Sequence, residues 1–153
     1  MVGTALGEKL RGKIPVVWAS HENLSLAFIW KIKFNETSKI PAFCNSMPEI
    51  CHNELTGMDV IDSTRAIVDQ VHVIMLEDES DHPRVQKRMQ VAREMLGERG
   101  IAVERIQLDG IGFEKAFKSA LLADWVSLSL ADFYGVPNPE TPLIAEFKKR
   151  ITQ

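Results

Sequence analysis

Three separate segments of the chain carry side chains that together could move a proton between neighbouring carbon atoms of a sugar. Glu36 closes an apolar run, His52 lies in a polar stretch further on, and Lys148 is close to the C-terminus. A carboxylate can remove the proton, an imidazole can exchange one with the ring oxygen near neutral pH, and an ammonium can balance the negative charge that develops. Because these residues are far apart in the sequence, the chemistry requires a fold that brings them together.

Each of the three residues also has an ordinary structural explanation. Glu36 alone is a surface carboxylate at the end of a predicted helix, where the helix dipole disfavours it. His52 alone is a loop histidine. Lys148 begins the run Lys148-Lys149-Arg150, which the dipole favours near a helix C-terminus, and Lys149 is the alternative if the functional register differs by one. The residue types therefore permit the chemistry without requiring it.

Size and composition exclude several classes of protein. With 153 residues, 45% hydrophobic and 25% charged, the chain matches one globular domain. Its net charge of −3 and the lack of an extended basic stripe argue against nucleic-acid binding. No apolar run reaches the roughly 18–20 residues of a membrane span, and the charged N-terminal segment does not match a secretory signal.

The cysteine content indicates a reducing compartment. Cys44 and Cys51 are the only two cysteines, and we expect reduced thiols and a cytoplasmic location. Together with His52 they offer three candidate metal ligands without a fourth, so we predict no metal site.

The hydrophobic pattern alternates between strand-like and helix-like segments. Apolar runs predict strands at 14–19, 40–44, 71–76 and 101–108, and longer periodic segments predict helices at 4–11, 21–36, 82–99, 111–134 and 142–151. Strands that alternate with helices form βαβ units around a parallel sheet. The sequence therefore predicts one three-layer α/β/α domain over residues 1–153, with four to five parallel strands. The polar stretch 45–69 is expected to be functional or partly helical, because structureless loops of this length are uncommon.

One histidine follows a predicted strand at the edge where open α/β sheets bind ligands. His21 comes directly after the first strand, although a position in the first helical turn also explains it. The acidic run Glu77-Asp78-Glu79 comes after the third strand, and we predict that it is a solvated turn.

Two predicted helices carry more apolar surface than one face of a sheet can cover. The helix at 21–36 is apolar nearly all round, and the helix at 111–134 carries a long stripe. The stripe consists of Phe113, Phe117, Leu121, Asp124/Trp125 and Leu128. We therefore predict a homodimer or a complex with a partner domain rather than a monomer.

Several motifs, in a fixed order, resemble the C-terminal half of the bifunctional phosphoglucose/phosphomannose isomerases, which are sugar isomerase (SIS) domain proteins. The matching segments are WKIKFNETSK at 30–39, PAF at 41–43, PEICHNE at 48–54, ADWVSLSLA at 123–131, TP at 141–142 and FK at 147–148. The resemblance covers nearly the whole chain. It implies an SIS-type, flavodoxin-like fold, with residues 1–12 as a linker helix that leads into the second SIS domain.

The resemblance also implies roles for individual residues. Glu36 matches the general base, His52 the residue that opens the sugar ring, and Lys148 the lysine near the end of these proteins. Thr141 matches a threonine that gives room around C2 and C3 of the substrate, and we predict that Glu54 orients His52. The substrate is then a sugar 6-phosphate, and neither metal nor organic cofactor is expected.

One departure from the family pattern concerns the phosphate. The Ser/Thr-rich loop that grips the sugar phosphate lies in the first SIS domain of the family, and this chain has no equivalent segment. We therefore expect an isomerase domain that needs a partner SIS domain. The alternative is a non-catalytic sugar-phosphate-binding or dimerisation module, but such a module has no need of a base, so Glu36, His52 and Lys148 together favour the isomerase.

Overall fold

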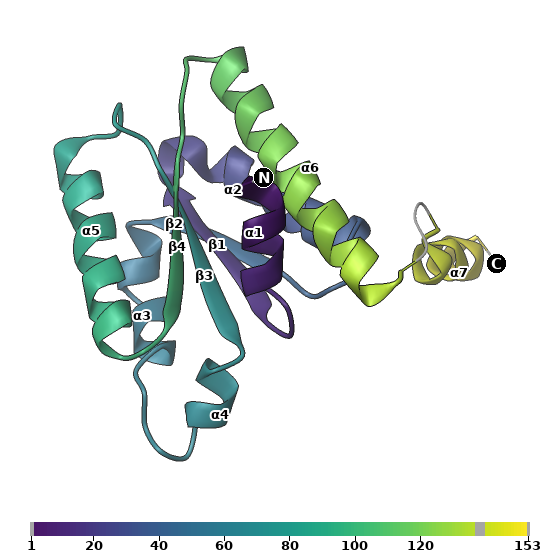
Figure 1. Ribbon diagram of the computed structural model, residues 1–153, viewed down its shortest axis with the longest axis horizontal. Helices are drawn as coiled ribbons and strands as arrows, with labels where there is room; N and C mark the ends of the chain where they lie inside the picture. The colour runs from purple at the N-terminus through teal and green to yellow at the C-terminus, as the bar shows by residue number, and fades with distance from the viewer. Residues whose placement is uncertain (1, 137–139, 153) are drawn as a thin grey trace.

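The computed structural model describes residues 2–136 and 140–152 and has a parallel four-stranded sheet between two layers of helices (Figure 1). The helices are α1 (Val2–Lys9), α2 (Leu24–Glu36), α3 (Glu54–Gly57), α4 (Arg65–Val68), α5 (Pro83–Glu98), α6 (Phe113–Tyr134) and α7 (Pro142–Ile151), with short 3-10 turns η1 (His21–Asn23) and η2 (Glu49–Cys51). The strands are β1 (Ile14–Ser20), β2 (Phe43–Met47), β3 (Val71–Glu77) and β4 (Ala102–Gln107), in the order β2-β1-β3-β4. This architecture confirms the predicted fold class.

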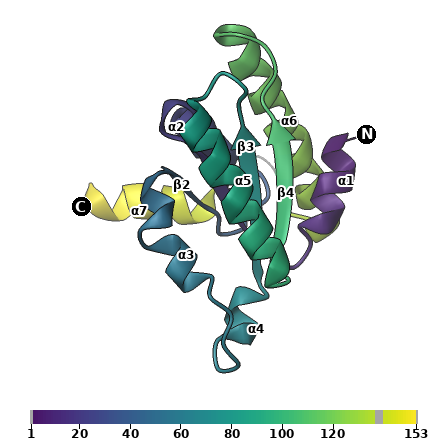
Figure 2. The ribbon, with the colours of Figure 1, turned by 90° about the vertical axis from the view of Figure 1, so that its left-hand side faces the viewer.

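Side-chain alternation along the strands builds the two halves of the core. Val17 and Ala19 point toward α1, α2 and α6, where Trp30 and Phe34 of α2 are completely buried. Trp18, on the other face, belongs to the cluster that includes buried residues of α5. Figure 2 views the molecule with α5 in front of the sheet. Both faces of the sheet are therefore covered, which explains why the strands are apolar on both faces.

The second strand was predicted three residues too early. Residues 40–44 were expected to form it, but the ladder with β1 joins Phe43–Met47 to Val16–Ser20. Residues 37–42, between α2 and β2, are held in place by side-chain hydrogen bonds rather than by a strand ladder. The buried Ser38 donates its hydroxyl to the carbonyl of Ser127 at 2.8 Å, and the Asn35 amide donates to the carbonyl of Ile40 at 2.9 Å. The Ser38 bond reaches a residue 89 positions away, so the apolar pattern of the segment itself gives no sign of it.

The two ends of the chain differ in how they pack. α1 lies against α6, and its Leu6 and Leu10 are buried in the core. α7 lies beyond the C-terminal end of α6, away from the sheet (Figure 1). Every described residue from 140 to 152 is exposed. The polar stretch 45–69 contains η2, α3 and α4, so the expectation that it is partly helical is confirmed.

Candidate functional site

Glu36 and His52 lie at opposite edges of the sheet. α2 begins after the carboxyl end of β1 and runs back, so Glu36, its last residue, lies at the edge where the parallel strands begin. His52 follows β2 and caps η2 at the edge where the strands end. β2 alone separates these edges by roughly 15 Å at the usual rise of a strand. One copy of the domain therefore does not bring the two residues together.

Glu36 is available to a ligand at its edge. Its side chain is exposed, and its backbone carbonyl accepts a hydrogen bond from the Lys39 ammonium at 2.6 Å. Lys39 adopts the left-handed backbone conformation, with φ of 56°, in the turn that follows α2. The C-terminal end of α2 is thus fixed by a local contact that leaves the Glu36 carboxylate open to solvent.

His52 is exposed as well, while Glu54 is held by the body of the domain. The His52 backbone N–H donates to the carbonyl of Glu49 at 2.9 Å. The Glu54 carboxylate accepts hydrogen bonds from the indole N–H of Trp18, at 2.8 Å, and from the Asn45 amide. These bonds anchor α3 to β1 and β2. That Glu54 orients His52 stays a prediction.

Thr141 and Lys148 belong to the part of the chain that packs least. Thr141 is the residue before α7, and Lys148 lies in its last turn beside Lys149 and Arg150. Both side chains are exposed. Because no described side chain of α7 is buried, the structure leaves Lys148 outside the folded body.

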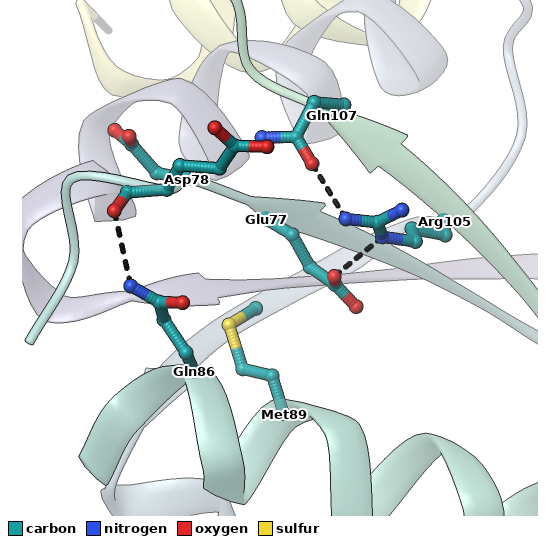
Figure 3. A pocket seen from close by; sticks show the side chains of 7 residues that line it. Glu77, Asp78, Gln86, Met89, Arg105 and Gln107 are labelled. Carbon is teal, nitrogen blue, oxygen red and sulfur yellow. Dashed lines mark hydrogen bonds and ion pairs between the residues drawn. The ribbon is translucent and has the colours of Figure 1, made fainter. Parts of the chain in front are cut away.

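The prediction that Glu77-Asp78-Glu79 is a solvated turn was wrong for its first two residues. Glu77 is largely buried and pairs with Arg105 at 2.5 Å and with Arg93 at 3.3 Å. Figure 3 shows Glu77 and Arg105 pointing toward one another at a small pocket of about 40 Å³. Asp78 is only 7% exposed. The sequence did contain a signal, since these acidic residues directly follow a buried strand at the ligand-binding edge of the sheet.

Asp78 is the centre of a buried polar cluster that sequence reasoning missed. Its carboxylate accepts hydrogen bonds from the Lys115 ammonium at 2.5 Å, the Asn23 amide at 3.1 Å, and the backbone N–H and hydroxyl of Ser80 at 2.9 and 2.7 Å. Burial alone would raise the pKa of Asp78, but these bonds outweigh it and hold the pKa well below its usual range. The neighbouring Asp81 is also buried, and burial raises its pKa.

This cluster joins the carboxyl ends of β1 and β3, between which the order of strands reverses. Asn23 comes from the turn after β1 and Lys115 from the first turn of α6. A hollow of about 400 Å³ opens beside Asp78 and Lys115, along the loop 107–112. The cluster ties three elements together at this edge.

Two absences concern the described part of the chain only. Within residues 2–136 and 140–152, no group of three His, Cys, Asp or Glu side chains is placed to hold a metal ion. Over the same residues, no helix is both long and apolar enough to cross a membrane.

Residues 3–151 match the family described as the bacterial phospho-glucose isomerase C-terminal SIS domain. The chain belongs to this family. Among curated proteins, the bifunctional phosphoglucose/phosphomannose isomerase of Aquifex aeolicus is 29% identical over 150 residues, which are 97% of this chain and 46% of the relative. The protein of the same name from Caldicellulosiruptor bescii is 32% identical over 139 residues, or 88% of this chain and 39% of the relative. This SIS domain thus spans less than half the length of these relatives.

Solved structures agree with the SIS fold. A glucose-6-phosphate isomerase like protein from Thermus thermophilus superposes with a TM-score of 0.67 at 16% identity, over 91% of this chain and 45% of that one. Tagatose-6-phosphate ketose/aldose isomerase from Escherichia coli gives a TM-score of 0.60 at 19% identity, over 92% and 43%. The resemblance inferred from the motifs is therefore confirmed.

Proposed function

We propose that this SIS domain is the C-terminal part of an aldose–ketose isomerase that interconverts glucose 6-phosphate or mannose 6-phosphate with fructose 6-phosphate. Family membership over residues 3–151 supports the isomerase class. The observation that carries the proposal to individual residues is the exposure of both Glu36 and His52 at the edges of an otherwise buried sheet. Neither side chain is committed to the core, so both can contact a substrate.

In the proposed reaction His52 first donates a proton to the ring oxygen while the C1 hydroxyl gives up its proton to water, so that the bond between C1 and the ring oxygen breaks and C1 becomes an aldehyde. Glu36 then takes the proton from C2, and the electrons of the broken C–H bond form a C1–C2 double bond as the C1 carbonyl oxygen gains a proton. This gives a cis-enediol. Glu36 then returns the proton to C1 while the C2 hydroxyl gives up its own proton to water, which offsets the proton gained at the C1 oxygen, so that C2 becomes the carbonyl of the ketose. Lys148 stabilises the negative charge that develops on the enediol oxygens, because a cation lowers the energy of an oxyanion most in a site shielded from water.

The separation of Glu36 and His52 supports a site that combines parts of two domains. The roughly 15 Å between the edges exceeds the reach of one hexose phosphate. We infer that Glu36 of one domain works with His52 of another, and that a partner SIS domain supplies the phosphate grip. Lys148 and Thr141 join the site when α7 packs against that partner.

The test uses this chain together with a first SIS domain from a related isomerase, supplied by mixing or fusion. Glu36→Gln keeps the shape of the side chain but cannot accept the C2 proton, so turnover should fall by at least roughly 10²–10⁴-fold. Glu98→Gln is the matched control, since Glu98 is an exposed carboxylate that ends α5. His52→Ala should slow ring-closed substrate more than an open-chain analogue.

A mixing experiment tests whether the site is shared. Copies with Glu36→Gln and copies with His52→Ala should each be nearly inactive, and their mixture should regain part of the activity. Near wild-type turnover of Glu36→Gln would show that the base is assigned wrongly. The non-catalytic sugar-phosphate-binding or dimerisation module would then be the better interpretation.

A further inference from the structure

The longest exposed apolar surface of the domain is one face of α6. The large side chains that the sequence placed in a stripe all point outward: Phe113 is 84% exposed, Phe117 73%, Leu121 58% and Trp125 52%, and Leu128 is exposed as well. The opposite face of α6, which packs into the core, has no aromatic side chain: its buried residues are Ser119, Ala123, Val126, Ser127, Leu130 and Ala131. The aromatic side chains of the stripe therefore face solvent and are available for contacts outside the domain.

We propose that the face of α6 formed by Phe113, Phe117, Leu121, Trp125 and Leu128, called here the α6 stripe, pairs with the same face of a second copy in an antiparallel, two-fold arrangement centred on Leu121. Steps of three and four residues keep these positions on one side of a helix. Leu121 is the middle of the stripe along the helix, and at 3.6 residues per turn it lies within about 20° of the centre of the stripe around the helix. A two-fold contact requires such a self-complementary patch.

The antiparallel register matches large side chains with large ones. A two-fold axis at Leu121 sets Phe117 of one copy at the height of Trp125 of the other, and Phe113 near the height of Leu128. Lys118 is exposed and projects from the edge of the stripe. In this pairing it reaches the side on which Trp125 of the second copy lies, where a lysine ammonium over an indole ring is favourable.

The area of the stripe suits a dimer. With about 150–250 Å² for each large aromatic side chain, the exposed parts of the five side chains present on the order of 600 Å². Polar residues at the rim, Glu114 and Lys118 among them, add to this. The total approaches the roughly 800 Å² per partner of a standard protein interface.

The amphipathic helix α7 is too short to cover the α6 stripe in its place. Leu143, Ile144, Phe147 and Ile151 give α7 an exposed apolar face of its own. Its 10 residues extend about 15 Å, whereas the stripe runs about 22 Å from Phe113 to Leu128. If α7 folded back from the end of α6, Phe113 and Phe117 at the far end would stay uncovered, and these are the two most exposed members of the stripe.

The antiparallel pairing has a consequence for the edges of the sheet. α6 starts after the carboxyl end of β4 and ends at the opposite edge. Two antiparallel copies of α6 therefore set the Glu36 edge of one domain on the same side as the His52 edge of the other. The pairing is inferred from α6 alone and does not depend on the proposed function.

The first test is the oligomeric state of this chain without substrate. Sedimentation at tens of micromolar should show a dimer for the wild type and a monomer for Leu121→Glu, because two glutamates meet at the axis. Ile67→Glu is the control, since Ile67 is an exposed apolar residue of α4 outside the stripe. Circular dichroism establishes that each variant is folded. A monomeric wild type, or a Leu121→Glu dimer, would overturn the proposal.

The second test uses disulfide formation to determine the register. In a Cys51→Ser background, Leu121→Cys should form a cross-linked dimer on oxidation, because Leu121 alone lies on the axis. Phe117→Cys should not, because its two copies are about 12 Å apart along the helices and cysteines with Cα atoms more than about 7 Å apart cannot be bridged. Cross-linking at Phe117 but not at Leu121 would refute the antiparallel register. A dimer that cross-links at neither position would assign the α6 stripe to a different partner, such as a separate SIS domain.

Discussion

Replacement of Asp78 by Asn should destabilise the domain, although Asp78 lies outside the proposed chemistry. The Asp78 carboxylate is 7% exposed and accepts hydrogen bonds from Lys115, Asn23 and Ser80. An amide of the same shape keeps part of this network but cannot balance the Lys115 charge. The ammonium then stays in a site where its side chain is only 20% exposed.

The magnitude follows from the burial of the pair. Removing one partner of a buried ion pair costs about 3–5 kcal/mol. Because Lys115 keeps some contact with water, we expect a value of about 2–3 kcal/mol for Asp78→Asn, at and below the lower end of that range. For a domain of this size the melting temperature changes by about 2–4 °C per kcal/mol. The variant should therefore melt roughly 5–10 °C below the wild type.

The contribution of Asp78 to the free energy of unfolding should also depend on pH. Hydrogen bonding holds the pKa of Asp78 in the folded state below that of the unfolded chain. Its contribution to stability is therefore complete above the unfolded value near 3.9 and is lost as the pH falls below it. The stability difference between wild type and Asp78→Asn should be largest near pH 7 and shrink below about pH 4.

Urea unfolding followed by circular dichroism measures both effects. The double variant Asp78→Asn/Lys115→Met should recover much of the loss, since it removes the unpaired charge. Asp62→Asn, at an exposed carboxylate, is the control and should change stability by less than about 0.5 kcal/mol. A loss below about 1 kcal/mol for Asp78→Asn, or a difference that does not shrink in acid, would refute the reasoning.

Further predictions concern one buried histidine and two glycines in helices. Burial lowers the pKa of His72 in the folded state. As the pH falls through about 6.5, the unfolded chain therefore takes up a proton that the folded chain does not, and the free energy of unfolding should decrease. His72→Leu should make this decrease smaller, as measured by urea unfolding at several pH values. Gly7→Ala should destabilise the contact of α1 with α6 by about 1–3 kcal/mol, because the added methyl would lie 2.8 Å from the Ser129 hydroxyl. Gly97→Ala in α5, with nothing within 4 Å of the new methyl, should instead stabilise by about 0.5–1 kcal/mol, and thermal melts that rank the two variants the other way would contradict this.

The sequence alone was sufficient for the layers of the fold and for the family. Apolar runs report burial on both faces of a sheet, and helical periodicity reports one buried side, so β1, β3, α5 and α7 were located closely. The motifs around Glu36, His52 and Lys148 can be recognised from the sequence alone, because each is a short segment of neighbouring residues.

Only the tertiary structure shows where β2 begins, that Asp78 is buried, and how far apart Glu36 and His52 lie. The segment before β2 is held by two hydrogen bonds, from Ser38 to the distant carbonyl of Ser127 and from Asn35 to the nearby carbonyl of Ile40. Asp78 looks like a solvated turn residue until Lys115, 37 positions away, is placed against it. Glu36 and His52 lie at opposite edges of the sheet, because α2 runs back from the carboxyl end of β1 whereas His52 follows the carboxyl end of β2. Their spacing of 16 residues in the sequence limits how far apart they can be but does not determine the distance.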